Sequence, residues 1–234
     1  MKIFRKGFNY SQDGPGNRLV YHLQGCNYRC KWCSNPEGMG AISENCMEYT
    51  PEEVCREAVR SKMMFFGGGG VTFTGGEPTM QFEELKEVLQ MLKNEGIHTA
   101  IETNASHPAL SELLPWIDHF IMDFKHFDSA KHQQWIGYGN EQVKKNLEMV
   151  CSMQREALIH IPLVNGFNND PEGFVEYFDT LNTAKLKFEI LPYHEYGKEK
   201  WTLPYEVKNG FVTAEDIQKF NTIFTAHGLT MVRT

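Results

Sequence analysis

Three cysteines in one short loop are the residues whose types and spacing most directly suggest chemistry. Cys26, Cys30 and Cys33 stand at the spacing CxxxCxxC, directly after an apolar segment that is typical of a strand. Three thiolates so close in sequence can bind one metal centre. A four-iron cluster usually takes four cysteine ligands, so three would leave one iron open to an outside ligand, as a catalytic cluster requires.

Other uses of these thiols match the spacing less well. A structural zinc ion favours paired cysteines with a distant second pair; here no second pair follows, and Cys46 or His22 would have to supply the fourth ligand. A redox CxxC site is also a poor match, because Cys26 lies nearby and the surrounding barrel-like pattern does not suit a thioredoxin unit. The other three cysteines, Cys46, Cys55 and Cys151, are isolated and are typical of small buried side chains.

Strand and helix patterns alternate along the chain in the order expected of a parallel sheet covered by helices. Runs rich in β-branched and aromatic residues predict strands at 19–24, 71–74, 99–103, 120–124, 158–164 and 186–191. Helical periodicity predicts helices at 51–62, 82–94, 142–153, 172–181 and 214–227, with weaker ones at 109–116 and 129–135. Polar and glycine motifs follow the carboxyl ends of the strands, where ligands of such folds bind.

Composition and charge argue against several classes of function. The chain of 234 residues has 41% hydrophobic residues, as an ordinary globular protein does, and a formal net charge of -7. This charge argues against a protein that binds nucleic acid by neutralising many phosphates. Residues 1–10 contain no continuous apolar segment, so we expect no signal peptide, no membrane anchor and a cytoplasmic protein. We expect one domain over residues 1–234.

The cysteine motif, with Trp32 just before its last cysteine, resembles the signature of the radical S-adenosylmethionine (SAM) superfamily. In that superfamily the three cysteines hold one [4Fe-4S] cluster, and the amine and carboxylate of SAM occupy the open iron. Gly75, Gly76 and Glu77, preceded by Thr74, resemble the GGE motif that binds the amino group of SAM. The resemblance implies an α/β fold, the incomplete (β/α)6 barrel.

Further segments resemble enzymes that activate glycyl radical enzymes. Residues 13–18 resemble their DGPG(I/V)R element, with Asn17 at the usual aliphatic position. Residues 191–198 resemble the LPYHxxGxxK segment of enzymes that activate pyruvate formate-lyase. Residues 122–125 resemble the DxK element that meets the carboxylate and ribose of SAM, and residues 101–104 resemble the DTN element.

The resemblance also implies roles for individual residues. The positions that it places at SAM are Trp32, Thr74, Gly75, Gly76, Glu77, Glu102, Asp123, Lys125, His160 and His194. Among these, His160 replaces an arginine of the family. Glu102 replaces an aspartate that helps to bind a monovalent cation beside the SAM carboxylate, so the resemblance implies such a cation. Asp13 and Arg18 are expected to contact the glycine loop of a partner protein.

The implied reaction uses one electron from reduced flavodoxin or ferredoxin to cleave SAM. The resulting 5′-deoxyadenosyl radical takes a hydrogen atom from the Cα of a glycine in pyruvate formate-lyase or a related glycyl radical enzyme. The only cysteines between Cys33 and Gly67 are Cys46 and Cys55, which are too few to bind further clusters. We therefore expect one cluster and no ferredoxin-like insert. Activation of anaerobic ribonucleotide reductase, a radical reaction on a small molecule, and a zinc-binding interaction module are the alternatives.

Overall fold

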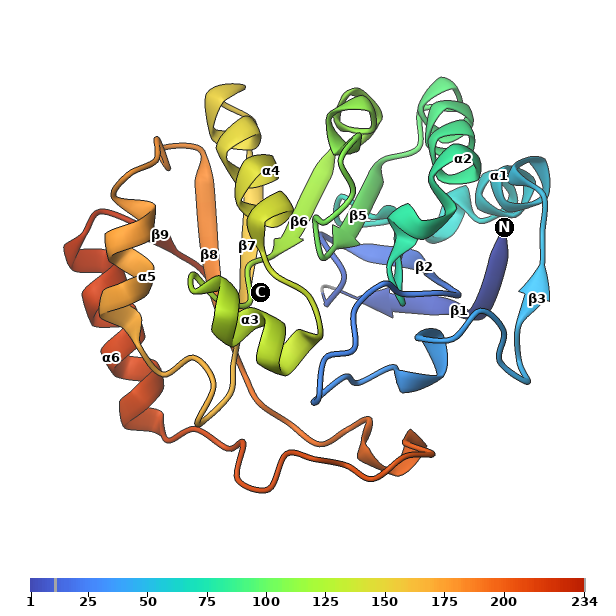
Figure 1. The fold of residues 1–234 in the computed structure, drawn as a ribbon. Coiled ribbons are helices and arrows are strands. Elements are labelled where there is room, and N and C mark those ends of the chain that lie inside the picture. The colour runs from blue at the N-terminus through green and yellow to red at the C-terminus, as the bar shows by residue number, and fades with distance from the viewer. Residues whose placement is uncertain (11, 234) are drawn as a thin grey trace.

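A single curved sheet organises the computed structural model, which describes residues 1–10 and 12–233 (Figure 1). Among those residues the sheet has nine strands in the order β3-β1-β2-β4-β5-β6-β7-β8-β9. The strands are β1 Lys2–Tyr10, β2 Asn17–Leu23, β3 Met47–Glu48, β4 Gly70–Gly75, β5 Thr99–Thr103, β6 His119–Asp123, β7 Ala157–Leu163, β8 Leu186–Pro192 and β9 Thr230–Met231. From β2 to β9 all neighbours pair in parallel, whereas β1 is antiparallel to both β2 and β3.

The six predicted strands are confirmed as β2, β4, β5, β6, β7 and β8, and they form the incomplete (β/α)6 barrel. Strands β1, β3 and β9 were not predicted from the sequence. β1 extends the barrel wall beyond β2, and its pairing with β3 involves only Lys2 and Ile3. Register between parallel strands is continuous, for example from Arg18 opposite Gly70 to Leu23 opposite Gly75.

Helices cover the outer face of the sheet (Figure 1). They are α1 Pro51–Arg60, α2 Phe82–Asn94, α3 Ser129–Ile136, α4 Glu141–Ser152, α5 Pro171–Phe178 and α6 Ala214–Ala226. The helix predicted at 109–116 is wrong: two 3-10 turns, Leu110–Glu112 and Leu114–Trp116, take its place. Pro115 explains the difference, because proline has no backbone N–H to continue an α-helix.

The main core lies between the sheet and the helices that cover its outer face. On that face the hydroxyl of Tyr21 donates to Glu57 of α1, and the rings of Tyr21 and Phe73 stack with their centroids 5.7 Å apart. Further along the same face, Phe178 from α5 packs on Phe188 from β8 at 4.8 Å, and Phe224 from α6 completes that cluster. Burial of such large rings supplies most of the packing energy that holds helices to a sheet.

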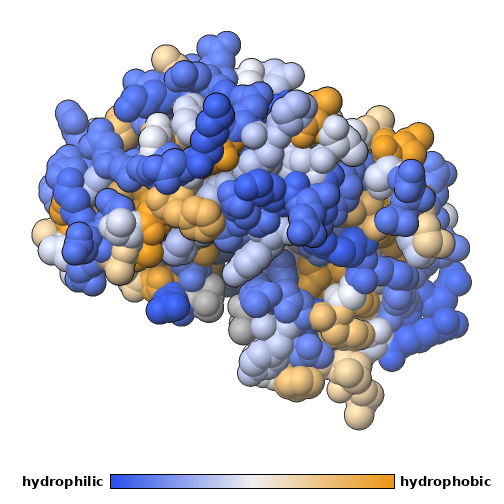
Figure 2. Space-filling model, turned by 90° about the horizontal axis from the view of Figure 1, so that it is seen from below, coloured by the Kyte–Doolittle hydropathy of each residue, from blue (hydrophilic) through white to orange (hydrophobic). Residues whose placement is uncertain are grey.

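Two segments far apart in sequence lie at the same end of the barrel, below the strands in Figure 1. They are the loop that follows β2 and the connection from β8 to α6. The surface seen from that side is mostly hydrophilic, with separate hydrophobic patches (Figure 2). Across the described residues, no helix combines the length and the apolar character needed to cross a membrane.

Candidate functional site

A cavity opens where the carboxyl ends of the six parallel barrel strands meet. The three cysteines line it together with residues from every one of these strands or the loops that follow them. Its other lining residues are Tyr28, Trp32, Ser34, Asn35, Met39, Thr74, Gly75, Gly76, Glu77, Glu102, Thr103, Asn104, Asp123, Lys125, Pro162, Leu191, Pro192 and His194. The fold therefore brings most of the predicted site residues into one place.

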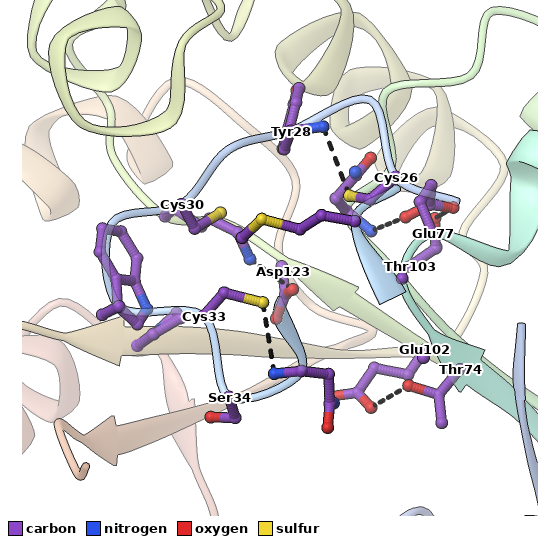
Figure 3. A pocket seen from close by; sticks show the side chains of 18 of the residues that line it. Cys26, Tyr28, Cys30, Cys33, Ser34, Thr74, Glu77, Glu102, Thr103 and Asp123 are labelled. Carbon is purple, nitrogen blue, oxygen red and sulfur yellow. Dashed lines mark hydrogen bonds and ion pairs between the residues drawn. The ribbon is translucent and has the colours of Figure 1, made fainter. Parts of the chain in front are cut away.

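The side chains of Cys26, Cys30 and Cys33 project from one loop into this cavity (Figure 3). Two of the sulfurs accept backbone N–H groups, Cys26 Sγ from Tyr28 at 3.3 Å and Cys33 Sγ from Asn35 at 3.4 Å. Burial raises the pKa of Cys26 and Cys30 to about 12 and that of Cys33 to about 11. Without a metal these sulfurs are thus thiols at neutral pH, and metal binding has to displace their protons.

Backbone contacts fix the path of the cysteine loop. The N–H of Arg29 donates to the carbonyl of Ile136 at 2.9 Å, and that of Lys31 donates to the carbonyl of Trp135 at 3.2 Å. Both acceptors belong to the last turn of α3, whose final carbonyls have no partner within the helix. The loop therefore satisfies the carboxyl end of α3 while α3 holds the loop in place.

Gly75 and Gly76 allow the end of β4 to pack directly on the start of the cysteine loop. Gly75 has φ of +118°, and a Cβ there would lie 2.5 Å from the backbone nitrogen of Leu23. A Cβ on Gly76 would lie 2.3 Å from the carbonyl oxygen of Gly25. The close backbone approach that these glycines permit is therefore made to the chain just before Cys26, and both glycines also line the cavity.

The carboxylate of Glu77 is hydrogen-bonded by other residues of the protein. Its carboxylate accepts hydrogen bonds from the N–H and hydroxyl of Thr79, the hydroxyl of Thr103 at 2.6 Å and the N–H of Asn104 at 2.7 Å. Burial raises the pKa of Glu77, and these hydrogen bonds oppose that shift. The side chain thus ties the loop after β4 to the loop after β5, a role that the sequence analysis did not foresee.

Asp123 and Lys125 form an ion pair at the end of β6. Burial alone would lower the pKa of Lys125, but the negative charge of Asp123 outweighs it and raises that pKa.

Trp32 lies on another wall of the cavity, where its ring packs on Phe167 at 5.0 Å. His194, after β8, is partly exposed and stacks on Tyr196 at 4.2 Å.

Glu102 lies at the end of β5 between two protein partners. Its Oε2 accepts from the hydroxyl of Thr74 at 2.8 Å, and its Oε1 lies 3.3 Å from Nδ1 of His160. His160 is 4% exposed and does not line the cavity, so it lies behind Glu102. Its second nitrogen faces Glu189 of β8 at 3.5 Å. Glu189 was not predicted from the sequence, although an acidic residue between the apolar Phe188 and Ile190 of a strand was a signal.

Asp13 and Arg18, the two residues expected to contact a partner, lie in different surroundings. Asp13 lines a second cavity, which shares five lining residues with the first: Ser34, Asn35, Thr74, Glu102 and His194. Arg18 is 1% exposed at the amino end of β2, where it donates to the hydroxyl of Thr72 and to backbone carbonyls. Its guanidinium therefore connects neighbouring strands and presents no surface to a partner.

Comparisons with known proteins agree with this arrangement. A sequence profile of the radical SAM superfamily matches residues 20–178. The pyruvate formate-lyase-activating enzyme of Staphylococcus epidermidis is 36% identical over 212 residues, which cover 84% of this chain and 84% of that protein. The enzyme of the same name from Staphylococcus aureus is 34% identical, with the same coverage of both chains.

Solved structures show the same relationship. A domain of pyruvate-formate lyase-activating enzyme from Bacteroides vulgatus superposes with a TM-score of 0.60 at 30% identity, covering 70% of this chain and 98% of that one. QueE from Escherichia coli, at 16% identity, shares the fold with a TM-score of 0.65 over 98% of this chain and 92% of its own. The chain therefore belongs to the radical SAM superfamily and, within it, to the family of pyruvate formate-lyase-activating enzymes.

Proposed function

We propose that this chain activates a glycyl radical enzyme, pyruvate formate-lyase or a relative of it, by cleaving SAM at a [4Fe-4S] cluster. Superfamily membership implies the cluster and SAM, and the relatives named above are activating enzymes. The single observation that carries the proposal is the convergence of three cysteine thiols on a cavity that Gly75, Gly76 and Lys125 also line. Neither a nucleic acid nor a membrane has a role in the proposed activity.

The donor set fits a four-iron cluster. Cys26, Cys30 and Cys33 are the three cysteines among the described residues that line the cavity, so one iron would lack a protein thiolate. We propose that they hold one cluster, and that the chain is one domain without a ferredoxin-like insert. When bound, the cluster and SAM supply the one-electron chemistry, which is reductive cleavage of the sulfonium and removal of a hydrogen atom from a glycine Cα.

The other cavity residues would bind and orient SAM. We assign the SAM amine to the backbone carbonyls of Gly75 and Gly76, which accept hydrogen bonds from an ammonium. Lys125 and Asp123 would hold its carboxylate and ribose, and Trp32 and His194 would flank the adenosyl group. Binding at several points fixes the sulfonium in one orientation, and fixed geometry is a large part of such catalysis.

The second cavity is the proposed entrance for the glycine loop of the partner. Asp13 lines it, and it joins the first cavity at Thr74, Glu102 and His194. An extended loop that enters there would bring its glycine beside the SAM-binding residues. A reduced flavodoxin or ferredoxin would donate the electron.

The implied monovalent cation fits this site poorly. Glu102 and Asp123 are the carboxylates that would bind it, and with His160 they offer ligand atoms within 4.8 Å of one another. Each carboxylate already faces a basic side chain of the protein, Glu102 facing His160 and Asp123 facing Lys125. The proposed function therefore assigns no role to a bound alkali ion.

Electron paramagnetic resonance tests the proposed function. The anaerobically reconstituted protein, given SAM, a reductant and pyruvate formate-lyase, is expected to produce 5′-deoxyadenosine and a glycyl radical doublet. Cys26→Ala should abolish both products. Cys46→Ala is the matched control and should retain both, because Cys46 does not line the cavity. Deoxyadenosine without a doublet on any glycyl radical enzyme would favour a small-molecule substrate instead.

A further inference from the structure

A row of buried and half-buried charged side chains crosses the barrel at the level of Asp123. In the sheet register His160 of β7 is opposite Asp123 of β6 on one side and Glu189 of β8 on the other. Its Nδ1 lies 3.3 Å from Glu102, and its Nε2 lies 3.5 Å from Glu189. Both His160 and Glu189 are 4% exposed. The imidazole is thus held between two carboxylates inside the barrel.

This placement favours the imidazolium form of His160. Burial alone would lower the pKa of His160, but its hydrogen bond to Glu102 and its ion pair with Glu189 outweigh burial and raise it. Burial would likewise raise the pKa of Glu102, whereas its contacts with His160 lower it. Both residues therefore carry charge at neutral pH, and His160 provides a fixed positive charge behind Glu102.

Two of the carboxylates that line the cavity, those of Glu102 and Asp123, are consequently balanced by basic side chains of the protein. His160 lies against one oxygen of Glu102, while the hydroxyl of Thr74 donates to the other. Lys125 is paired with Asp123. An alkali ion would have to compete with these two side chains for the same oxygens.

We propose that His160 is a positioning residue that replaces the free monovalent cation beside Glu102. This inference rests on the proposed function, since it concerns how the same site binds SAM. His160 does not line the cavity and acts through Glu102, which it holds in place and neutralises. The longer side chain of glutamate, compared with aspartate, allows the carboxylate to reach the imidazole. SAM binding by this enzyme then needs no sodium or potassium.

Calorimetric titration of SAM into the reconstituted holoenzyme tests this proposal. In the wild type, exchange of sodium and potassium for tetramethylammonium should change the Kd of SAM by less than about twofold. His160→Asn should raise that Kd about tenfold in tetramethylammonium, the effect expected for loss of one charged hydrogen bond. Sodium or potassium should restore most of the affinity of this variant, and sodium NMR relaxation should detect ion binding only to the variant.

Two further variants complete the experiment. His160→Arg keeps a fixed positive charge beside the longer side chain of Glu102, which the aspartate of the family does not provide, and should bind SAM independently of alkali ions. His227→Asn is the matched control, because His227 forms an exposed pair with Asp179 at 2.7 Å, remote from the cavity. A wild type whose SAM affinity requires an alkali ion overturns the inference, as does His160→Asn without ionic rescue. If His160→Asn does not fold, the alkali-ion dependence of SAM binding by the wild type and by His160→Arg still tests the inference. Failure to bind SAM in any salt would instead overturn the proposed function.

Discussion

Trp201 donates its indole N–H to the backbone carbonyl of Cys33 at 3.0 Å. Beside it, Nζ of Lys200 donates to the carbonyl of Ser34 at 3.0 Å. The connection between β8 and α6 therefore holds the end of the cysteine loop, although the two segments are far apart in sequence (Figure 1). A loop held in this way keeps its third cysteine in position before any metal binds.

Trp201→Phe should loosen this attachment, because it removes the indole N–H but keeps an aromatic ring beside Tyr205. The lost hydrogen bond is worth about 1 kcal/mol, which corresponds to a several-fold change in the population of a displaced loop. We expect the variant to release cluster iron to a chelator several-fold faster than the wild type under anaerobic conditions. Trp116→Phe is the matched control, at the amino end of the barrel. Equal release rates for all three proteins would contradict the prediction.

Much of the fold could be predicted because apolar runs and helical periodicity report directly on burial. The six barrel strands are the example, since each is a short apolar segment bounded by turn residues. β1 was missed because Lys2–Tyr10 is exposed along much of its length, and its pairing depends on β2 and β3. Alternation of basic and apolar residues was its only local signal.

For the candidate site, too, some features could be predicted from the sequence and others could not. Motifs with fixed spacing located the cysteines, the glycines and Lys125, because local sequence sets which loop carries them. The partners of Glu77, Arg18 and His160 could not be predicted, since each depends on which buried groups the completed barrel brings together. Glu189 became recognisable only once the register placed it opposite His160.

Glu77→Gln should destabilise the protein. A glutamine keeps one acceptor oxygen, and its amide nitrogen would face donors that now bind the carboxylate, including the N–H of Asn104. Leaving a buried donor unpaired costs about 2 kcal/mol. Thermal unfolding under anaerobic conditions should show a Tm lowered by about 4–8 °C. Glu87→Gln, an exposed change on α2, should leave the Tm unaltered. Equal Tm values for the two variants would contradict the role of Glu77 in joining the loops after β4 and β5.

Arg18→Lys should separate a structural role from contact with a partner. The guanidinium donates to the hydroxyl of Thr72 at 2.6 Å and to the carbonyl of Val71 at 2.7 Å, and one ammonium cannot reproduce this geometry. We expect a loss of about 2 kcal/mol in the free energy of unfolding, with the Kd of SAM unchanged. Unchanged stability combined with weaker binding of the glycyl radical enzyme would instead support the partner contact expected from sequence.

Acid should destabilise the protein partly through His132. This histidine is 1% exposed on α3, and its Nδ1 lies 2.6 Å from the carbonyl oxygen of Tyr138. Burial lowers its pKa to about 4, compared with about 6.5 in an unfolded chain. The unfolded chain therefore takes up a proton first as the pH falls. The contribution of His132 to stability is complete above about pH 6.5 and is lost as the pH falls toward 4.

Urea unfolding of the anaerobic protein at about pH 7.5 and about pH 5.5 measures this effect, which should amount to about 1 kcal/mol from His132. His132→Gln keeps a donor for the Tyr138 carbonyl and does not titrate, so its stability should fall by about 1 kcal/mol less than that of the wild type over this interval. Because α3 also holds the cysteine loop, the variant should retain its cluster longer in acid. If the two proteins lose the same free energy, another group is responsible for the pH dependence.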